Sequence, residues 1–260
     1  MSKAFFGLPE KVIFCRHCVI SNQRPSSTVE FKHTKDEKKA TIGMDEHEVC
    51  DACRYQEVKA GQIDWTRRED ALVALLDKHR RNDGGYDIVV PGSGGKDSAY
   101  TSHLLKYRYG MNPLTVTWAP HKYTDIGWKN FENWVHVGGH DNILFTPNGR
   151  LHRHLTRLAF QNLLHPFQPF IVGQRIIGPL MAAKFGVKLV MYGENQAEYG
   201  NNPNENYVPT MDRKFFSVQN PEEMSLGGVS VGQIIRETDF TLNDFAPYIP
   251  PSAEFLDEKG

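Results

Sequence analysis

The stretch of this sequence best suited to phosphate chemistry is SGGKDS, residues 93–98. Its glycines let backbone N–H groups approach an anion closely, Ser93 and Ser98 add hydroxyl donors, and Lys96 adds a full positive charge. The spacing is not that of a Walker A loop, because only two residues separate Gly92 from the Gly-Lys pair. The stretch predicts a phosphate loop of another class. The alternative is a glycine turn that serves only close helix packing.

All four cysteines form two C-x-x-C pairs near the start of the chain, Cys15 with Cys18 and Cys50 with Cys53. Two such pairs can bring four thiolates together around one ion, which predicts a closed zinc site with a role in folding. Disulfides and a redox pair are the alternatives, and a cytoplasmic setting counts against disulfides. Because no cysteine follows Cys53, the rest of the chain has no thiol nucleophile, persulfide carrier or iron–sulfur ligand set.

A phosphate loop must be held between a buried strand and a helix. The apolar run that ends at Pro91 predicts that strand, and a helix pattern runs from Lys96 to Gly110. Further apolar strands are expected in 112–120, 142–147 and 187–195, and helices in 124–139, 148–164 and 175–186. This alternation predicts an α/β fold, a parallel sheet with helices on both faces. The site is expected at the carboxyl ends of the strands.

Composition places broad limits on the function. The chain has 260 residues, 40% of them hydrophobic, and a net charge of -1. We therefore expect a small zinc-ribbon-like module over residues 1–64 and an α/β domain over 65–260. No apolar run is long enough to span a bilayer, and the first residues do not resemble a signal peptide, so a cytoplasmic protein without membrane partners is expected. The charge balance predicts no general affinity for nucleic acid.

SGGKDS resembles the PP-loop of the ATP pyrophosphatases, which bind the pyrophosphate of ATP in this loop and transfer AMP to a carbonyl oxygen. With the paired cysteines, PFIVGQRIIGP (169–179) and YGENQAEYG (192–200), the whole chain resembles the N-acetyl sugar amidotransferases of surface-polysaccharide (O-antigen, lipopolysaccharide) synthesis. The resemblance implies a HUP-like fold. It also implies an enzyme that adenylates the acetamido oxygen of a nucleotide-linked N-acetyl sugar and replaces it with ammonia, releasing AMP and pyrophosphate. Members of the family are longer, so we expect the C-terminal part to be truncated or discontinuous.

Site residues follow from the loop and from the resemblance. Lys96, Asp97 and Ser98 are predicted to be catalytic. The predicted ATP-binding residues are Gly92, Ser93, Gly94, Gly95, Lys96, Asp97, Ser98, Gly193 and Arg175. The resemblance implies a magnesium ion held by Glu198 or Glu194, with Asp97 as a further ligand.

Several of these assignments have alternatives. Asp97 can instead cap the following helix, and the two glutamates can be exposed turn carboxylates. Arg175, expected at a helix start just after Gly173, can be a surface arginine. His152 and His154 diverge on a helix, so they form a poor metal pair and are expected to be surface or partly buried residues.

Two other functional classes fit part of the sequence. One is a PP-loop tRNA-modifying thiolase. Those enzymes carry a C-x-x-C-G pattern at the place where this chain has Pro169, Val172 and Gly173. The other is a non-enzymatic zinc-ribbon module that binds nucleic acid, which leaves the glycine loop unexplained. For the amidotransferase, the lack of a free thiol predicts that ammonia comes from a separate glutaminase subunit.

Overall fold

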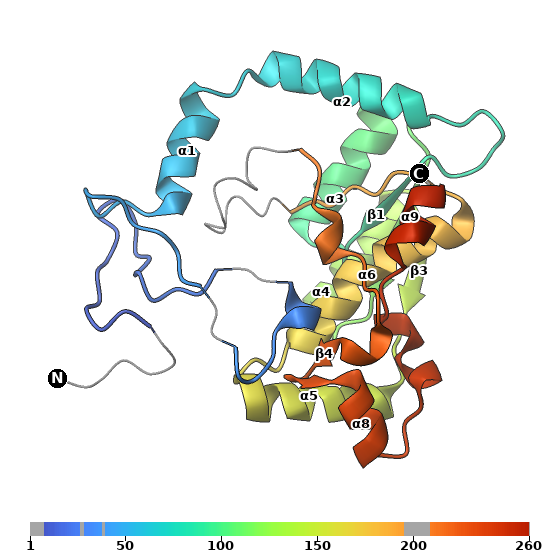
Figure 1. The fold of residues 1–260 in the computed structure, drawn as a ribbon. Helices are drawn as coiled ribbons and strands as arrows, with labels where there is room; N and C mark the ends of the chain where they lie inside the picture. The colour runs from blue at the N-terminus through green and yellow to red at the C-terminus, as the bar shows by residue number, and fades with distance from the viewer. Residues whose placement is uncertain (1–7, 27–28, 38–39, 195–208, 260) are drawn as a thin grey trace. The chain divides into compact units, whose positions relative to one another are not determined.

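The computed structural model describes residues 8–26, 29–37, 40–194 and 209–259. The chain divides into two compact units (Figure 1). Unit 1 comprises Met1–Val29, Asp36–Asp70 and Asn195–Met211, and unit 2 comprises Glu30–Lys35, Ala71–Glu194 and Asp212–Gly260. The domain boundary expected between residues 64 and 65 stays a prediction.

Unit 1 has little regular structure among its described residues. It contains helix α1 (Asp51–Gly61) and the start of helix α2 (Trp65–His79). Three isolated antiparallel bridges join the rest: Phe14 with Ser21, Pro25 with Thr41, and Met44 with Cys50. Its buried core consists of Cys15, Ile42, Val49 and Cys50. A core of this size stabilises a fold weakly by apolar burial alone, so a further cross-link is needed.

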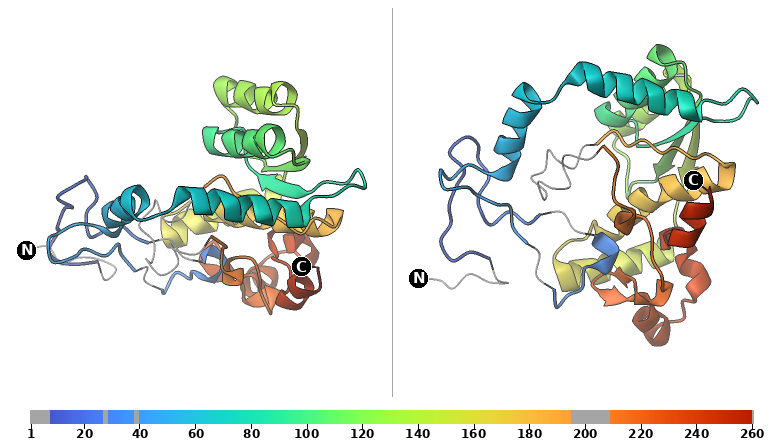
Figure 2. Two further views of the ribbon diagram at one scale, coloured as in Figure 1. Left: turned by 90° about the horizontal axis from the view of Figure 1, so that it is seen from above. Right: turned by 45° about the horizontal axis from the view of Figure 1, so that its top comes forward.

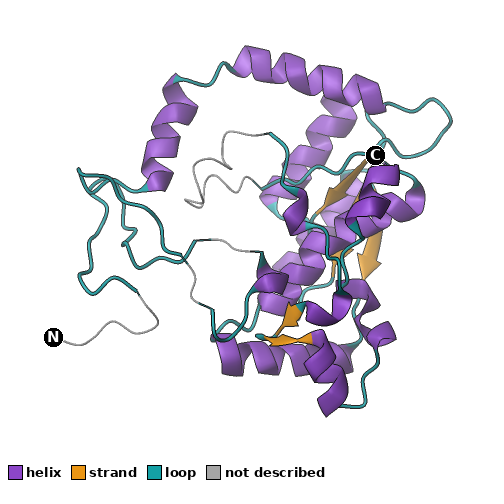
Figure 3. Ribbon diagram, in the orientation of Figure 1, coloured by secondary structure: helices purple, strands orange, loops and turns teal. Residues whose placement is uncertain are grey.

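Unit 2 is built on the parallel sheet that the apolar runs predict (Figure 3). Strand β1 (Ile88–Pro91) pairs with β2 (Pro113–Trp118), and β2 pairs with β3 (Asp141–Phe145), all in parallel. Every residue of β1 and β2 is buried, as expected for strands covered on both faces. The α/β class with a parallel sheet between helices is confirmed.

The fourth expected strand, in 187–195, is reduced to one parallel bridge between Val190 and Val89 of β1. Val89 N–H donates to the carbonyl of Leu189, and Met191 N–H donates to the carbonyl of Val89, both over 2.9 Å. These bonds lie on the edge of β1 opposite to β2, because successive residues of a strand point their backbone groups to opposite neighbours. The chain therefore returns to β1 after building β2 and β3.

Helices cover both faces of the sheet, as Figure 2 (left) shows for the green and the yellow helices. On one face lie α3 (Lys96–His103), its π-helical continuation η2 (Leu104–Arg108), α4 (Asp125–Glu132) and its continuation η3 (Asn133–Val137). On the other lie α5 (Gly149–Leu163) and α6 (Gln168–Phe185). The strand alternation fits this: Ile88 and Val90 pack with Leu105 of η2, whereas Pro91 lies against Gly178 of α6.

Shorter elements complete unit 2. They are η1 (Glu30–Lys32), η5 (Arg213–Phe215), η6 (Pro221–Glu223), β4 (Ser225–Leu226), β5 (Val229–Ser230), α8 (Val231–Glu237), η7 (Leu242–Tyr248) and α9 (Ala253–Lys259). Gln168 holds the antiparallel β4–β5 hairpin, because its side chain donates to the carbonyl of Ser225 and accepts from Gly227 N–H. Among the described helices, none is long and apolar enough to cross a membrane.

Helix α6 begins earlier than the sequence indicated. A start just after Gly173 was expected, but the helix begins at Gln168 with Pro169 in its first turn, where proline needs no N–H partner. The prediction of Arg175 at a helix start is therefore wrong. The start signal was missed because Gln168 has tertiary partners: it is fully buried and donates to the carbonyls of Glu30 and Ser225.

The hydrogen bond that a proline removes from α6 is replaced by one from the segment that pairs with β1. Pro179 has no N–H to donate to the carbonyl of Arg175, four residues earlier in the helix. The hydroxyl of Tyr192 donates to that carbonyl over 2.6 Å. This hydrogen bond ties the segment next to β1 to the helix that covers the sheet.

We predict that Tyr192→Phe lowers the free energy of unfolding by about 1–2 kcal/mol, because it removes the donor to the Arg175 carbonyl without changing the ring. Urea unfolding followed by circular dichroism measures this. Tyr100→Phe is the matched control, since the Tyr100 side chain is exposed on α3. Equal losses in the two variants would contradict the role given to Tyr192.

Candidate nucleotide and metal sites

The glycine loop lies at the carboxyl end of β1, between that strand and α3. Gly92 N–H donates to the carbonyl of Val116 over 2.9 Å and so extends the pairing with β2 into the loop. On one side of β1 lie β2 and β3, and on the other lies the segment around Val190. The sheet order therefore reverses at β1. In open α/β sheets, ligands bind outside the carboxyl ends of the strands at such a reversal.

Two glycines allow backbone to lie very close to this loop. Gly94 has φ +79°, and a Cβ there would lie 2.9 Å from the Cα of Phe131 in α4. At Gly193, a Cβ would lie 2.7 Å from the carbonyl carbon and oxygen of Asp97. The structure thus brings the predicted Gly193 to the first turn of α3. The close packing considered as the alternative for the glycines of the loop is present at Gly94, and a second close backbone contact occurs at Gly193.

The first turn of α3 presents the polar residues of the loop. Its N-cap is Gly95, which has no side chain to cap this end, and Asp97 is the acidic residue of the first turn. Asp97 Oδ1 lies 2.5 Å from Lys96 Nζ, and the Lys96 side chain is 88% exposed. A cation at a helix N-terminus is disfavoured by the helix dipole. A bound anion would stabilise both the lysine and the positive end of the helix dipole at this turn.

The two serines of the loop differ in their surroundings. Ser93 is exposed, so its hydroxyl is accessible to a ligand. Ser98 is buried, and its Oγ donates to the carbonyl of Gly95 over 3.2 Å. Ser98 therefore stabilises the turn in the structure.

The other predicted phosphate and magnesium residues are placed differently. Arg175 is a residue of the middle of α6, and its guanidinium lies 5.6 Å from the ring centroid of Phe215. Glu194 is exposed and directly follows Gly193, so it lies beside the start of α3. Glu198 lies outside the described residues. The backbone of Gly193, next to Glu194 in the chain, lies against the backbone of Asp97.

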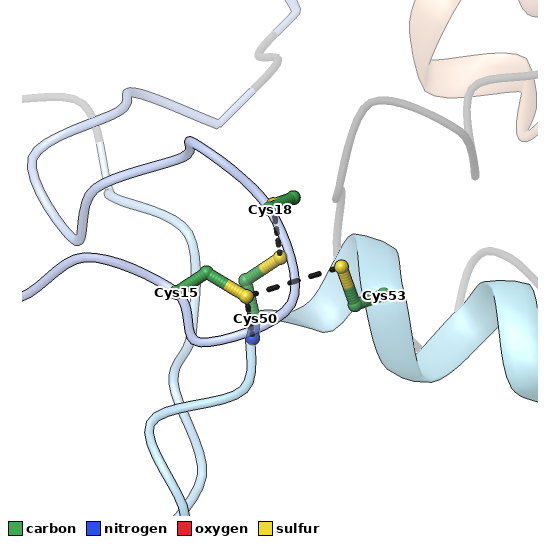
Figure 4. A group of neighbouring side chains, drawn as sticks. All are labelled: Cys15, Cys18, Cys50 and Cys53. Atoms are coloured by element: carbon green, nitrogen blue, oxygen red, sulfur yellow. Dashed lines mark hydrogen bonds between the residues drawn. The ribbon is translucent and has the colours of Figure 1, made fainter.

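The four cysteines form one cluster within unit 1 (Figure 4). Their sulfur atoms all lie within 4.8 Å of one another. Cys15 Sγ is 3.9 Å from Cys53 Sγ, and Cys18 Sγ is 3.7 Å from Cys50 Sγ. A tetrahedral zinc site with Zn–S bonds of about 2.3 Å has sulfur atoms about 3.8 Å apart. The cluster therefore fits a metal ion such as zinc, and all four thiols are free of disulfides.

Backbone N–H groups point at this cluster. His17 N–H and Cys50 N–H each donate to Cys15 Sγ over 3.4 Å. Burial opposes ionisation of Cys15, but these hydrogen bonds outweigh it and lower the pKa of the thiol to about 6. Burial raises the pKa of Cys50 and Cys53. Since four neighbouring thiols do not all ionise unaided, a cation is needed to hold them as thiolates.

We predict about one zinc ion per chain, lost in Cys50→Ser and retained in His17→Ala. His17 is the matched control, because it is the histidine between Cys15 and Cys18 yet its ring lies outside the four-sulfur cluster. Elemental analysis gives the zinc content, and thermal unfolding with and without a chelator gives the stabilisation. Loss of zinc from both variants would instead indicate a ligand set that includes His17.

The sequence did not indicate the buried state of His152. It was expected to be a surface or partly buried residue, but only 8% of it is exposed, and its Nδ1 lies 2.7 Å from Tyr248 Oη. The signal was its helical spacing: Leu151, Leu155 and Ala159 form the buried side of α5, and His152 lies beside them. His121 stacks on the same ring, with centroids 4.8 Å apart.

Comparison with known proteins gives no relative, because no protein-family model and no curated protein matches the chain. The functional assignment therefore depends on the residues and their geometry.

Proposed function

We propose that this chain is an ATP-dependent amidotransferase that converts the acetamido group of a nucleotide-linked N-acetyl sugar into an acetamidino group, for surface-polysaccharide synthesis. The observation that carries the proposal is the position of SGGKDS at the point where the sheet order reverses. There the exposed Lys96, the hydroxyl of Ser93 and the start of α3 all favour an anion. The HUP-like PP-loop fold is part of the same proposal, supported by the return of the chain to β1.

The proposed reaction has two steps. The amide oxygen attacks the α-phosphorus of ATP, an O–P bond forms, and pyrophosphate leaves. Ammonia then adds to the activated carbon, the C–O bond breaks, AMP leaves with the former amide oxygen, and a proton is lost to give the amidine. Adenylation is needed because an unactivated amide oxygen is a very poor leaving group.

The loop residues have separate roles in this proposal. Backbone N–H groups of residues 93–97, with Ser93 and Lys96, bind the departing pyrophosphate and stabilise its charge. Ser98 holds the turn through the carbonyl of Gly95. Asp97 and Glu194 would hold a magnesium ion that neutralises phosphate charge. Zinc in the cysteine cluster has a structural role in unit 1.

The cysteine positions favour this reaction over tRNA thiolation. Sulfur transfer by a thiolase needs thiols near the nucleotide, and the chain has no cysteine after Cys53. The positions compared with the thiolase motif hold buried apolar residues of α6, namely Pro169, Val172 and Gly173.

We predict that Lys96→Ala lowers ATP-dependent turnover by about 100-fold or more, because it removes positive charge that the leaving pyrophosphate requires. Ser98→Ala should lower turnover by roughly tenfold through loosening of the turn. The measurement is release of AMP and pyrophosphate with ATP, magnesium, ammonium and a panel of nucleotide-linked N-acetyl sugars. Mass spectrometry of the sugar shows a loss of about one mass unit when oxygen is replaced by NH.

Lys184→Ala is the matched control, since Lys184 is exposed in the last turn of α6. It should keep wild-type turnover. Wild-type turnover in Lys96→Ala, with the fold intact by circular dichroism, would refute the assignment of the loop.

We predict that the isolated chain uses ammonium and not glutamine as its nitrogen source. Release of ammonia from glutamine usually proceeds through a thioester on an activated cysteine, and all four thiols belong to the four-cysteine cluster that fits a metal ion. A separate glutaminase subunit is thus the proposed partner. Parallel reactions with ammonium or glutamine test this, and equal product from both, in protein free of glutaminase, would contradict it.

A further inference from the structure

Six ring-bearing residues of unit 2 gather beyond the carboxyl end of β2. We call them the aromatic cluster: Trp118, His121, His152, Phe167, Phe170 and Tyr248. Trp118 is the last residue of β2, and His152 lies in the first turn of α5, which follows β3. The cluster therefore lies at the same edge of the sheet as the glycine loop, which follows β1.

Two buried nitrogen atoms of this cluster lack hydrogen-bond partners. They are Trp118 Nε1 and His152 Nε2, neither of which has a partner among the residues that the structure describes. Trp118 is 2% exposed and His152 is 8% exposed. An unsatisfied buried polar group costs about 1–3 kcal/mol, so two in one cluster call for an explanation. A ligand that accepts hydrogen bonds would satisfy both.

The Tyr248 contact occupies one of the two ring nitrogens of His152. Tyr248 Oη lies 2.7 Å from His152 Nδ1. Burial, with a smaller contribution from His121, lowers the pKa of His152 to about 4, and burial raises the pKa of Tyr248. Both groups are therefore neutral at neutral pH. When the phenol donates to Nδ1, the proton of the imidazole lies on Nε2, so Nε2 is a donor like Trp118 Nε1.

The rest of the cluster offers flat surfaces. The ring of His121 stacks on His152 at 4.8 Å and lies 5.7 Å and 5.6 Å from the rings of Phe167 and Phe170. His121 and Phe167 are exposed, so these surfaces can be reached from solvent. A charged ligand group would lose its hydration against these rings.

Close packing of α6 sets the orientation of Trp118. A Cβ at Gly173 would lie 2.3 Å from Cε2 of the indole, the carbon bonded to Nε1. Only a glycine allows the ring to lie this close to the helix. The indole therefore has little freedom to turn Nε1 toward another partner.

We propose that the aromatic cluster binds an uncharged ring that carries a carbonyl oxygen. The oxygen accepts hydrogen bonds from Trp118 Nε1 and His152 Nε2, and the ring stacks on the exposed faces of His121 and Phe167. A pyrimidine base carries such an oxygen on its ring, and an N-acylated sugar carries it on its acyl group. The acceptor of the proposed reaction carries an N-acylated sugar linked to a nucleotide. The choice of ligand class rests on the proposed function only in this respect, because binding here requires no ATP.

Calorimetric titration of the full chain tests the site with uridine, with N-acetylglucosamine and with glucose, which lacks the carbonyl. At least one of the two carbonyl ligands should bind, and glucose should bind at least tenfold more weakly. Trp118→Phe should weaken binding about tenfold, since it removes one N–H donor and keeps a ring. Phe160→Ala, an exposed ring elsewhere on α5, should not change it.

Nitrogen-15 NMR of the histidine rings provides a test that needs no variant. Addition of the bound ligand should shift the Nε2 proton resonance of His152 while Nδ1 keeps the chemical shift of an acceptor. Absence of binding by both carbonyl ligands, or equal affinity for glucose, would overturn the proposal. The titration contains no ATP, so its result is independent of the turnover assay. Ligand binding in the titration with no ATP cleavage in the turnover assay would refute only the proposed enzyme activity. ATP cleavage in the turnover assay with no ligand binding in the titration would refute only this site.

Discussion

Hydrogen bonding at both edges of β1 is the interaction on which the rest of unit 2 depends. Gly92 N–H continues the pairing with β2, while Val89 exchanges two hydrogen bonds with Leu189 and Met191 on the other side. This double pairing buries β1 completely and makes it the point where the sheet order reverses. The glycine loop follows at the end of this strand, so its position is set by the most constrained strand of the sheet.

The segment that pairs with β1 is short, and contacts outside the sheet hold it. Tyr192 donates to the carbonyl that Pro179 leaves without a helical partner, and Gly193 lies against the backbone of Asp97. Both contacts need particular residue types: a hydroxyl of the right reach and a residue without a Cβ. They link α6, the returning segment and the start of α3, so a change in any one of them is transmitted to the loop.

The two units are stabilised in different ways. Unit 2 buries apolar strands between helices, whereas the described part of unit 1 has a core in which two of the four buried residues are cysteines. Without a metal ion, that core places neighbouring thiols in an environment that raises the pKa of Cys50 and Cys53 by burial. A metal ion bound by these thiols would cross-link the chain and so stabilise the fold of unit 1.

The sequence by itself determined the features that depend on neighbouring residues. The apolar strand before SGGKDS, the helix after it, the parallel α/β class and the gathering of two C-x-x-C pairs all follow from local pattern and spacing. The tertiary structure alone decided the features that depend on distant partners. Gln168 moved the start of α6, Arg175 came to lie over Phe215, and His152 gained its ring contact with Trp118 and its hydrogen bond with Tyr248. Their partners lie between 17 and 138 residues away along the chain, as the Tyr192–Arg175 and Gln168–Glu30 hydrogen bonds illustrate. Periodicity reports which side of a helix is apolar, but it carries no information on which distant group completes a hydrogen bond or a ring stack.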